Sequence, residues 1–243
     1  MLQNIDHNKL NQLMCNNDEI QQIISQLLEN HHSILSSVAH EIRNPLTLIS
    51  SSLQLIELQH PETKDFYGWK QLIEDVDFIR LLLEDLTTFN NGHTLCCSTF
   101  SMEHFLKNIS IAFAMANEFQ NSKIEYTSCI PSSLGTFYGD KIKLREVILN
   151  LLRNAIEAID NYGTIQLSAT RSKKTLTIKI QDTGCGIPED QIDSIFDPFV
   201  THKPNGTGLG LAISKKIIES HNGTITAESE YENGTCFTIC LPT

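Results

Sequence analysis

Apolar residues recur at intervals of three and four between positions 35 and 56, a spacing that places them along one side of an α-helix. They are Leu35, Val38, Ile42, Leu46, Ile49, Leu53 and Ile56. After the turn signal His60-Pro61-Glu62, a second helical pattern from about Thr63 to Asn90 carries Leu72, Val76, Ile79, Leu83 and Leu86. Two helices joined by a turn have little core of their own. We therefore expect a homodimer in which two hairpins pack as a four-helix bundle.

His40 lies off the first apolar stripe, beside Glu41 and one turn before Pro45. An imidazole on the exposed flank of a helix contributes little to packing, but it can meet another protein or a nucleotide-bearing domain. Proline inside a helix costs about 3 kcal/mol, so we expect a kink after His40. By itself, His40 is more simply interpreted as an ordinary surface histidine. Residues further along the chain favour a nucleophile.

Asn150 and Asn154 lie one turn apart in a helical pattern from about Lys141 to Ile159. Side chains at i and i+4 share a helix face, so both amide oxygens can meet a magnesium ion and the phosphates that it carries. The pair alone would fit an ordinary polar helix face equally well.

An alternating strand pattern from Thr175 to Asp182 runs directly into a turn that contains Gly184 and Gly186. The carboxylate of Asp182 can accept a hydrogen bond from an exocyclic amine such as that of adenine. The two glycines allow the backbone to approach a flat base closely.

A glycine-rich segment, Gly206-Thr207-Gly208-Leu209-Gly210, opens a further helix that is predicted to run to His221. Glycines before a helix N-terminus favour phosphate binding. The spacing G-x-G-x-G follows a loop and differs from the dinucleotide fingerprint G-x-G-x-x-G, so a Rossmann site is not expected. Two strands, 224–229 and 235–241, are predicted to close the chain.

A further block, Ile195-Phe196-Asp197-Pro198-Phe199, stands before the glycine-rich segment. Together the blocks resemble, in order, the H, N, G1, F and G2 boxes of bacterial two-component sensor histidine kinases, over roughly residues 33–243. The resemblance implies an α+β chain: a helical-hairpin dimerisation and phosphoacceptor domain, then an α/β-sandwich ATP-binding domain of the GHKL type shared with gyrase, Hsp90 and MutL. The expected divisions are an N-terminal helical extension over 1–30, the hairpin over 31–93 and the catalytic domain over 94–243.

The implied activity is ATP-dependent autophosphorylation of His40, with Glu41 orienting the imidazole and accepting its proton. Residue reasoning alone would not pair these two, because side chains at i and i+1 diverge on a helix. The implied cofactors are ATP and Mg²⁺, with Asn154 as the metal ligand. The implied nucleotide-site residues are Asn150, Asn154, Asp182, Gly184, Gly186, Phe196, Lys203, Gly206, Thr207, Gly208, Leu209 and Gly210.

Two positions distinguish this chain within that superfamily. Hydrolysing members place a glutamate, which activates water, where this chain has Asn150, so transfer to a histidine fits better than hydrolysis. Many histidine kinases carry a lysine three residues after the second asparagine, where this chain has Glu157. In the short-lid branch that resembles nitrogen-regulation and sporulation kinases, a lid lysine stands in the place of Lys203. We expect Lys203 to supply the missing positive charge.

The resemblance also implies partners. A response regulator would take the phosphoryl group on its receiver aspartate after docking on the hairpin near Arg43 and Asn44. The pattern E-x-x-N from Glu41 to Asn44 resembles the segment by which some of these kinases hydrolyse the regulator's phosphoaspartate. Residues 1–30 are interpreted as an extension of the first helix, with a docking segment for a separate sensory protein as the alternative.

Composition excludes other classes. A net charge of −11 offers no basic stripe for nucleic acid. No apolar run approaches about 18 residues, so a cytoplasmic protein without membrane insertion is expected. Seven cysteines without a C-x-x-C pair argue against a disulfide framework and a zinc site.

Two alternative functions remain from the sequence. One is a phosphorelay or scaffold protein that keeps the hairpin but has lost ATP binding, against which Asn154, Asp182 and the glycines argue. The other is a serine kinase or ATPase of the same superfamily, which would lack the hairpin that carries His40.

Overall fold

The computed structural model describes residues 18–91, 95–115, 123–203 and 206–243. The chain divides into two compact units, Met1–Asn91 and Gly92–Thr243. This division falls two residues before the boundary predicted between residues 93 and 94. Residues 92–94 lie outside the described part of the chain, as do residues 1–17 of the predicted N-terminal extension.

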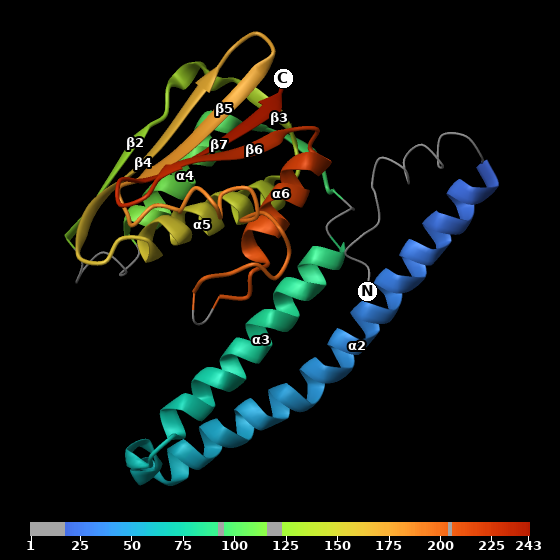
Figure 1. Ribbon diagram of the computed structural model, residues 1–243, viewed down its shortest axis with the longest axis vertical. Coiled ribbons are helices and arrows are strands. Elements are labelled where there is room, and N and C mark those ends of the chain that lie inside the picture. Colours follow the sequence, from blue (N-terminus) through green and yellow to red (C-terminus); the bar gives the residue numbers. More distant parts are fainter. Residues whose placement is uncertain (1–17, 92–94, 116–122, 204–205) are drawn as a thin grey trace. The chain divides into compact units, whose positions relative to one another are not determined.

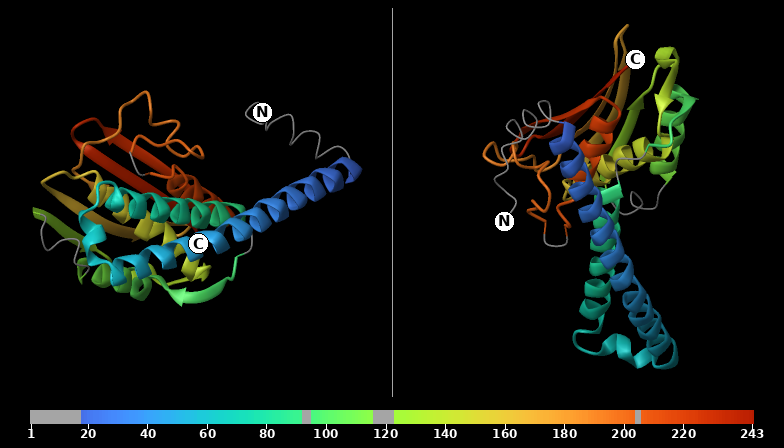
Figure 2. Two further views of the ribbon diagram at one scale, coloured as in Figure 1. Left: turned by 90° about the horizontal axis from the view of Figure 1, so that it is seen from below. Right: turned by 90° about the vertical axis from the view of Figure 1, so that its right-hand side faces the viewer.

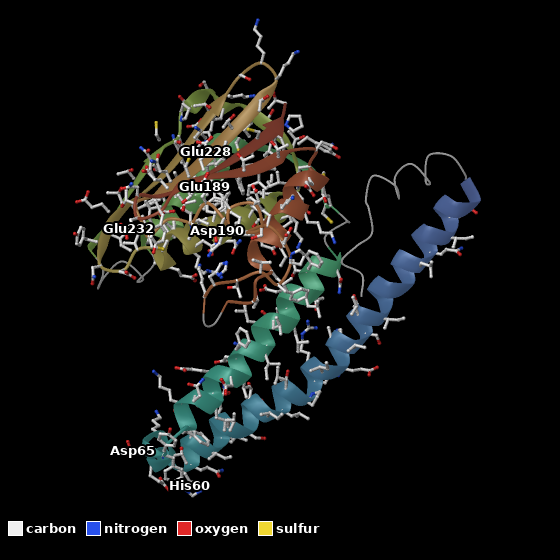
Figure 3. The ribbon with its side chains drawn as sticks, viewed as in Figure 1. His60, Asp65, Glu189, Asp190, Glu228 and Glu232 are labelled. Atoms are coloured by element: carbon white, nitrogen blue, oxygen red, sulfur yellow. The ribbon has the colours of Figure 1, made fainter. Side chains whose placement is uncertain are left out.

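Unit 1 is a helical hairpin of α2 (Asp18–Gln59) and α3 (Trp69–Asn91), joined by the short 3-10 helix η1 (Pro61–Asp65) (Figure 1). His60 and Asp65 lie at this turn (Figure 3). The second helix begins six residues later than the sequence indicated, because Pro61 starts a 3-10 turn and Gly68 adopts a φ of +83°. None of the helices in the described ranges combines the length and apolarity that a membrane span requires.

Helix α2 continues through Pro45, and the kink predicted after His40 stays a prediction. The hairpin core consists of Ala39, Leu46, Val76 and Leu83, with Leu53 packed against it. Other members of the two predicted stripes stay 39–48 % exposed: Val38, Ile42, Ile49, Ile56, Leu72 and Ile79. One neighbouring helix covers only part of a wide apolar stripe, so a single hairpin leaves these residues in water.

Unit 2 is built on a five-stranded sheet in the order β2-β4-β5-β7-β6. Its strands are β2 (Lys123–Cys129), β4 (Tyr162–Arg171), β5 (Thr175–Asp182), β6 (Thr224–Glu230) and β7 (Gly234–Pro242). The β2–β4 pair is parallel and the other pairs are antiparallel. A separate two-stranded sheet pairs β1 (Ser98–Ser101) with β3 (Thr136–Gly139), beside the 3-10 helix η3 (Ser132–Leu134).

Helices α4 (Met102–Met115), α5 (Lys141–Glu157) and α6 (Gly210–Ser220) cover one face of the large sheet (Figures 1 and 2). In β5 the even-numbered residues from Leu176 to Asp182 are buried and Lys179 and Gln181 are exposed, so one face meets the helices and the other meets water. The predicted strands 175–182, 224–229 and 235–241 are confirmed as β5, β6 and β7, and the α+β class is confirmed.

Asp140 fixes the start of α5. Its Oδ1 accepts the backbone N–H groups of Ile142 and Lys143, both at 3.0 Å, and its Oδ2 accepts that of Cys96 at 2.7 Å. The Asp140 N–H in turn donates to His221 Nε2 at 2.9 Å. Burial alone would raise the pKa of this carboxyl, but the backbone donors and His221 outweigh burial and lower the pKa below its ordinary value. The helix that carries Asn150 and Asn154 is therefore held at its first turn.

Candidate functional site

The C-terminal half of α5 presents Asn154 and Glu157 on one face, three residues apart. Lys203 Nζ donates to Asn154 Oδ1 at 3.1 Å and also to Glu157 Oε2. Lys203, which we expected to supply the positive charge missing at position 157, thus lies beside Glu157. Both ends of this ion pair are nearly half exposed, with relative side-chain accessibilities of 46 % for Lys203 and 44 % for Glu157.

Asn150 faces α6 rather than Lys203. Its Nδ2 donates to Ser214 Oγ at 3.0 Å, and Ser214 Oγ donates to the Gly210 carbonyl at 2.9 Å. A Cβ atom on Gly210 would lie 2.8 Å from Asn150 Oδ1. Asn150 and Gly210, which the sequence placed at the phosphates, therefore also hold the first turn of α6 against α5.

Asp182 is buried at the end of β5, and its Oδ1 accepts the Gly184 N–H at 2.8 Å. Burial raises the pKa of this carboxyl above its ordinary value, while the backbone N–H groups of Gly184 and Thr235 and the charge of Lys203 oppose that rise.

Gly184 and Gly186 let the turn after β5 pass between two other segments. The Cys185 N–H donates to the Ala158 carbonyl at 2.9 Å, and the Cys185 carbonyl accepts the Glu232 N–H at 2.8 Å. Gly186 has a φ of +68°, and a Cβ there would fall 2.2 Å from the Glu230 carbonyl oxygen. This turn is consequently fixed by the end of α5 on one side and by the β6–β7 turn on the other.

The segment from Phe196 to Gly208 is fastened at both ends. The Phe196 ring meets Phe237 edge to face, with centroids 6.4 Å apart. Phe199, which has a φ of +66°, donates its N–H to the Gly208 carbonyl at 2.9 Å. Gly208 has a φ of +67°, and a Cβ on it would clash with the Phe199 backbone at 2.6 Å. Of the residues that belong to this segment, 204 and 205 lie outside the described part of the chain.

The three remaining predicted residues lie where the segment enters α6. The Gly206 N–H donates to the Lys203 carbonyl at 3.2 Å. Thr207 Oγ1 accepts the Leu209 N–H at 3.3 Å, and Leu209 is fully buried as the residue before α6. The N-terminus of α6, with its unpaired backbone N–H groups, is thereby held close to Asn150.

The oxygen donors on α5 fit a hard cation. Among the described residues, no three His, Cys, Asp or Glu side chains converge as a metal site. An amide oxygen on Asn154 beside the Glu157 carboxylate suits Mg²⁺, which binds through one or two protein oxygens together with water and substrate phosphates. These residues therefore fit a magnesium ion that arrives with a nucleotide.

His40 and Glu41 are both exposed on α2. Their neighbour Ala39 is 1 % exposed and belongs to the hairpin core, so His40 lies beside the α2–α3 contact and open to solvent. Arg43 Nη2 donates to Thr87 Oγ1 of α3 at 3.1 Å, one turn further along. Asn44, at i+4 from His40, is exposed on the same side of the helix.

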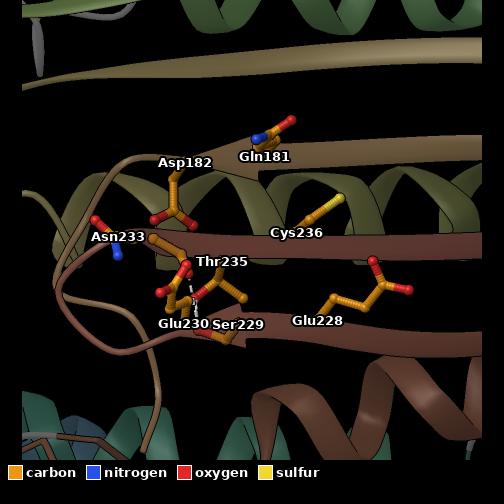
Figure 4. Close-up of a pocket in the computed structure, with 9 residues that line it drawn as sticks. Gln181, Asp182, Glu228, Ser229, Glu230, Asn233, Thr235 and Cys236 are labelled. Atoms are coloured by element: carbon orange, nitrogen blue, oxygen red, sulfur yellow. Dashed lines mark hydrogen bonds between the residues drawn. The ribbon is translucent and has the colours of Figure 1, made fainter.

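A cavity of about 330 Å³ lies at the ends of β5, β7 and β6, away from Asn154 and Lys203 (Figure 4). Gln181, Cys236 and Glu228 form one row of paired residues across these strands, on the face opposite the helices. Of the predicted nucleotide residues, this cavity includes Asp182 alone. Acidic residues flank the site in sequence, with Glu189 and Asp190 after the glycine turn and Glu232 in the β6–β7 turn (Figure 3).

Sequence reasoning missed Ser214 and Thr235. Ser214 is buried one turn after Gly210, and this i+4 relation to a glycine at a helix start could have indicated it. Thr235 is buried beside Asp182 and follows Gly234, which has a φ of +104°. Its oxygen Oγ1 lies 2.9 Å from Ser229 Oγ, a cross-strand contact that sequence periodicity does not reveal.

Residues 139–243 match the model of the histidine kinase-, DNA gyrase B-, and HSP90-like ATPases. The chain is 30 % identical over 223 residues to sporulation kinase C of Bacillus subtilis, a match that covers 90 % of this chain and 50 % of that protein. It is 32 % identical to sporulation kinase B of the same organism, covering 86 % of this chain and 49 % of the relative. The chain spans about half the length of these relatives.

The solved structure of the Acinetobacter baumannii histidine kinase AdeS is similar as well. It has a TM-score of 0.60 and 26 % identity, and the match covers 84 % of this chain and 97 % of that one. Both the hairpin and the sheet unit are therefore included in the likeness. Across both units the chain is therefore similar to sensor histidine kinases. Residues 139–243 of its unit 2 are of the histidine kinase-, DNA gyrase B- and HSP90-like ATPase type, and its unit 1 is the helical hairpin that carries His40.

We predict that Asp182→Asn raises the thermal stability of the protein and weakens its nucleotide binding. The raised pKa of Asp182 means that its ionised form is disfavoured in the fold, a cost that is present at neutral pH and disappears as pH falls from the folded pKa to the unfolded value. Thermal unfolding at pH 7 should show a higher midpoint for the variant, with a difference that shrinks towards pH 4. A lower midpoint for the variant at pH 7 would contradict this reading.

Proposed function

We propose that the chain is an ATP-dependent histidine autokinase that phosphorylates His40 and passes the phosphoryl group to the aspartate of a response-regulator receiver. The observation that carries the proposal is the combination, in one chain, of an exposed histidine beside a carboxylate on a helical hairpin and an ATPase-type domain with a buried Asp182. The names of the relatives, sporulation kinases that match across both units, support it.

The site residues have distinct parts in this reaction. The Asp182 carboxylate accepts a hydrogen bond from the adenine amine, while the N-terminus of α6 and the Lys203 ammonium face the phosphates. Asn154 ligates Mg²⁺, which neutralises phosphate charge when it is bound. Asn150, whose amide is bonded to Ser214, provides no carboxylate to activate water, so transfer is favoured over hydrolysis.

The transfer itself forms a bond between the γ-phosphorus and an imidazole nitrogen of His40 and breaks the bond from that phosphorus to the β,γ-bridging oxygen. ADP leaves with the electron pair of the broken bond. The exposed carboxylate of Glu41 accepts the proton that the imidazole loses. The reaction requires the exposed face of α2 to meet the nucleotide site of unit 2.

Incubation of the whole chain with γ-labelled ATP and magnesium tests this proposal, with His40→Gln and Asn154→Ala measured alongside. We expect label that is acid-labile and base-stable, as a phosphoramidate is, and that is lost in both variants. His31→Gln is the matched control, because it removes another histidine of the same helix. Label that survives His40→Gln, or an unlabelled wild-type protein, would overturn the proposal.

We propose that two hairpins associate in a homodimer. The support is the set of apolar side chains that one hairpin leaves 39–48 % exposed, among them Ile49 of α2 and Ile79 of α3. Burying such a row is favourable at roughly 25 cal/mol per Å². Light scattering should give twice the chain mass of 27.3 kDa for the wild type, and a lower mass for Ile79→Glu but not for the exposed-site control Gln54→Glu. A wild-type mass equal to one chain would contradict the homodimer.

The exposed amide of Asn44 supports a second reaction at the same surface, the hydrolysis of the receiver's phosphoaspartate. It lies one turn from His40, where it can hold the attacking water. We expect Asn44→Ala to slow the loss of label from a phosphorylated receiver while His40 is still labelled from ATP. Equal rates of loss for the variant and the wild type would remove Asn44 from this role.

ATP and receiver domains are cytoplasmic components, so the proposed reactions place both units in the cytoplasm. The helix α2 already includes residues 18–30, which favours a helical extension for that part of the predicted N-terminal segment. Docking of a separate sensory protein on this extension is the alternative proposal for how a signal reaches His40.

A further inference from the structure

Two side-chain oxygens on α5 converge on a single cation. Asn154 Oδ1 and Glu157 Oε2 both accept hydrogen bonds from Lys203 Nζ, although Lys203 is 46 residues further along the chain than Glu157. The two acceptors are separated by three residues on one helix, and this spacing alone places side chains on a common face. The contacts with one ammonium add that the two oxygens reach the same point in space.

We propose that Asn154 and Glu157 together form a magnesium seat, which Lys203 fills until Mg²⁺ enters with a nucleotide, and that Lys203 then moves to the phosphates. This inference rests on the proposed nucleotide binding. It assigns Glu157, whose charge would otherwise only oppose a nucleotide, as a second metal ligand. Lys203 becomes a positioning residue that exchanges one anionic partner for another.

The chemistry of the seat suits Mg²⁺. The ion prefers oxygen ligands and near-octahedral geometry at 2.0–2.1 Å, and it usually keeps several waters. Replacing the ammonium requires each oxygen to move inward by only about 1 Å, since N–H···O bonds are about 2.9 Å long. Glu157 is nearly half exposed, so water and phosphate oxygens have access to the remaining positions.

The charges give the seat a consequence for binding. Without a metal, Lys203 stays paired with Glu157, so an approaching phosphate group gains no cationic partner and is repelled by the carboxylate. With Mg²⁺ between them, both the phosphate and the carboxylate are attracted to the same ion. Glu157 should therefore make nucleotide binding depend strongly on Mg²⁺, more strongly than an uncharged side chain at this position would.

The test is calorimetric titration of the whole chain with ADP, once with Mg²⁺ and once with EDTA, and its readout is the ratio of the two affinities. We expect Glu157→Gln to lower that ratio by about tenfold or more, a loss of the size seen for groups that support a metal. The ratio should fall because the variant binds ADP more weakly in Mg²⁺ and more tightly in EDTA. A change in packing alone would weaken ADP binding in both buffers and leave the ratio unchanged.

Three further variants sharpen the result. Glu157→Asp keeps the carboxylate and should recover part of the ratio. Asp160→Asn, which makes the same change of charge at an exposed position just after α5, should match the wild type. Lys203→Met removes a phosphate partner in Mg²⁺ and leaves the Glu157 carboxylate unpaired in EDTA, so it should weaken both affinities and alter the ratio less than Glu157→Gln does.

An unchanged ratio in Glu157→Gln, with wild-type binding that still requires Mg²⁺, would overturn the seat and leave the proposed nucleotide binding intact. Failure of the wild-type chain to bind ADP in either buffer would overturn both. Paramagnetic Mn²⁺ in place of Mg²⁺ gives an independent readout, since its resonance with bound ADP should change in Glu157→Gln and not in Asp160→Asn.

Discussion

The hydrogen bonds of the Asp140 carboxylate set the position of α5, and the candidate site depends on that helix. One oxygen accepts the first free N–H groups of α5, and the other accepts the Cys96 N–H from the segment that enters unit 2. His221, after α6, accepts the Asp140 N–H. The start of unit 2, the start of α5 and the end of α6 thus meet at one residue, Asp140. The buried face of α5, which includes Leu144, Leu151 and Ala155, then fixes the rotation of the helix.

With this rotation, the polar face of α5 makes two sets of contacts. Asn150 bonds to Ser214 and holds α6, whose N-terminus is the expected phosphate position. Asn154 and Glu157, one turn further on, hold Lys203 of the segment between Phe196 and Gly208. The same helix therefore couples the phosphate end of the site to the lysine that would bind phosphate. Asp182, buried with a raised pKa, provides the third fixed point and is retained at a cost in stability.

The elements that could be predicted from sequence are those with a strong periodicity and clear start and stop signals. The helix predicted over 141–159 is α5, which ends at Glu157, and the strand predicted over 175–182 has the same bounds as β5. The family resemblance led us to expect that Lys203 supplies the positive charge missing at position 157. Its contact with Glu157, 46 residues away, leaves no periodic trace in the sequence. The sequence did not predict the elements between residues 98 and 139. Strand β2 forms a parallel pair with the distant β4, and β1 and β3 are only four residues long.

One local prediction failed for a physical reason. The second helix starts at Trp69 because Gly68, with its positive φ, separates it from the 3-10 turn. There a single glycine decided the outcome against a pattern that spans many residues. Helix α2, by contrast, continues through Pro45, and Ala39 and Leu46 on either side of that residue pack into the hairpin core.

The most direct test of the account is to locate the nucleotide by hydrogen exchange of the whole chain with and without ADP and Mg²⁺, followed by mass spectrometry. The account predicts slower exchange in the second half of α5, in the turn that contains Gly184 and Gly186, and in the first turn of α6. The part of β6 around Glu228, whose side chain is exposed on the sheet face opposite the helices, should be unchanged. Protection around Glu228, with none along α5, would contradict the account.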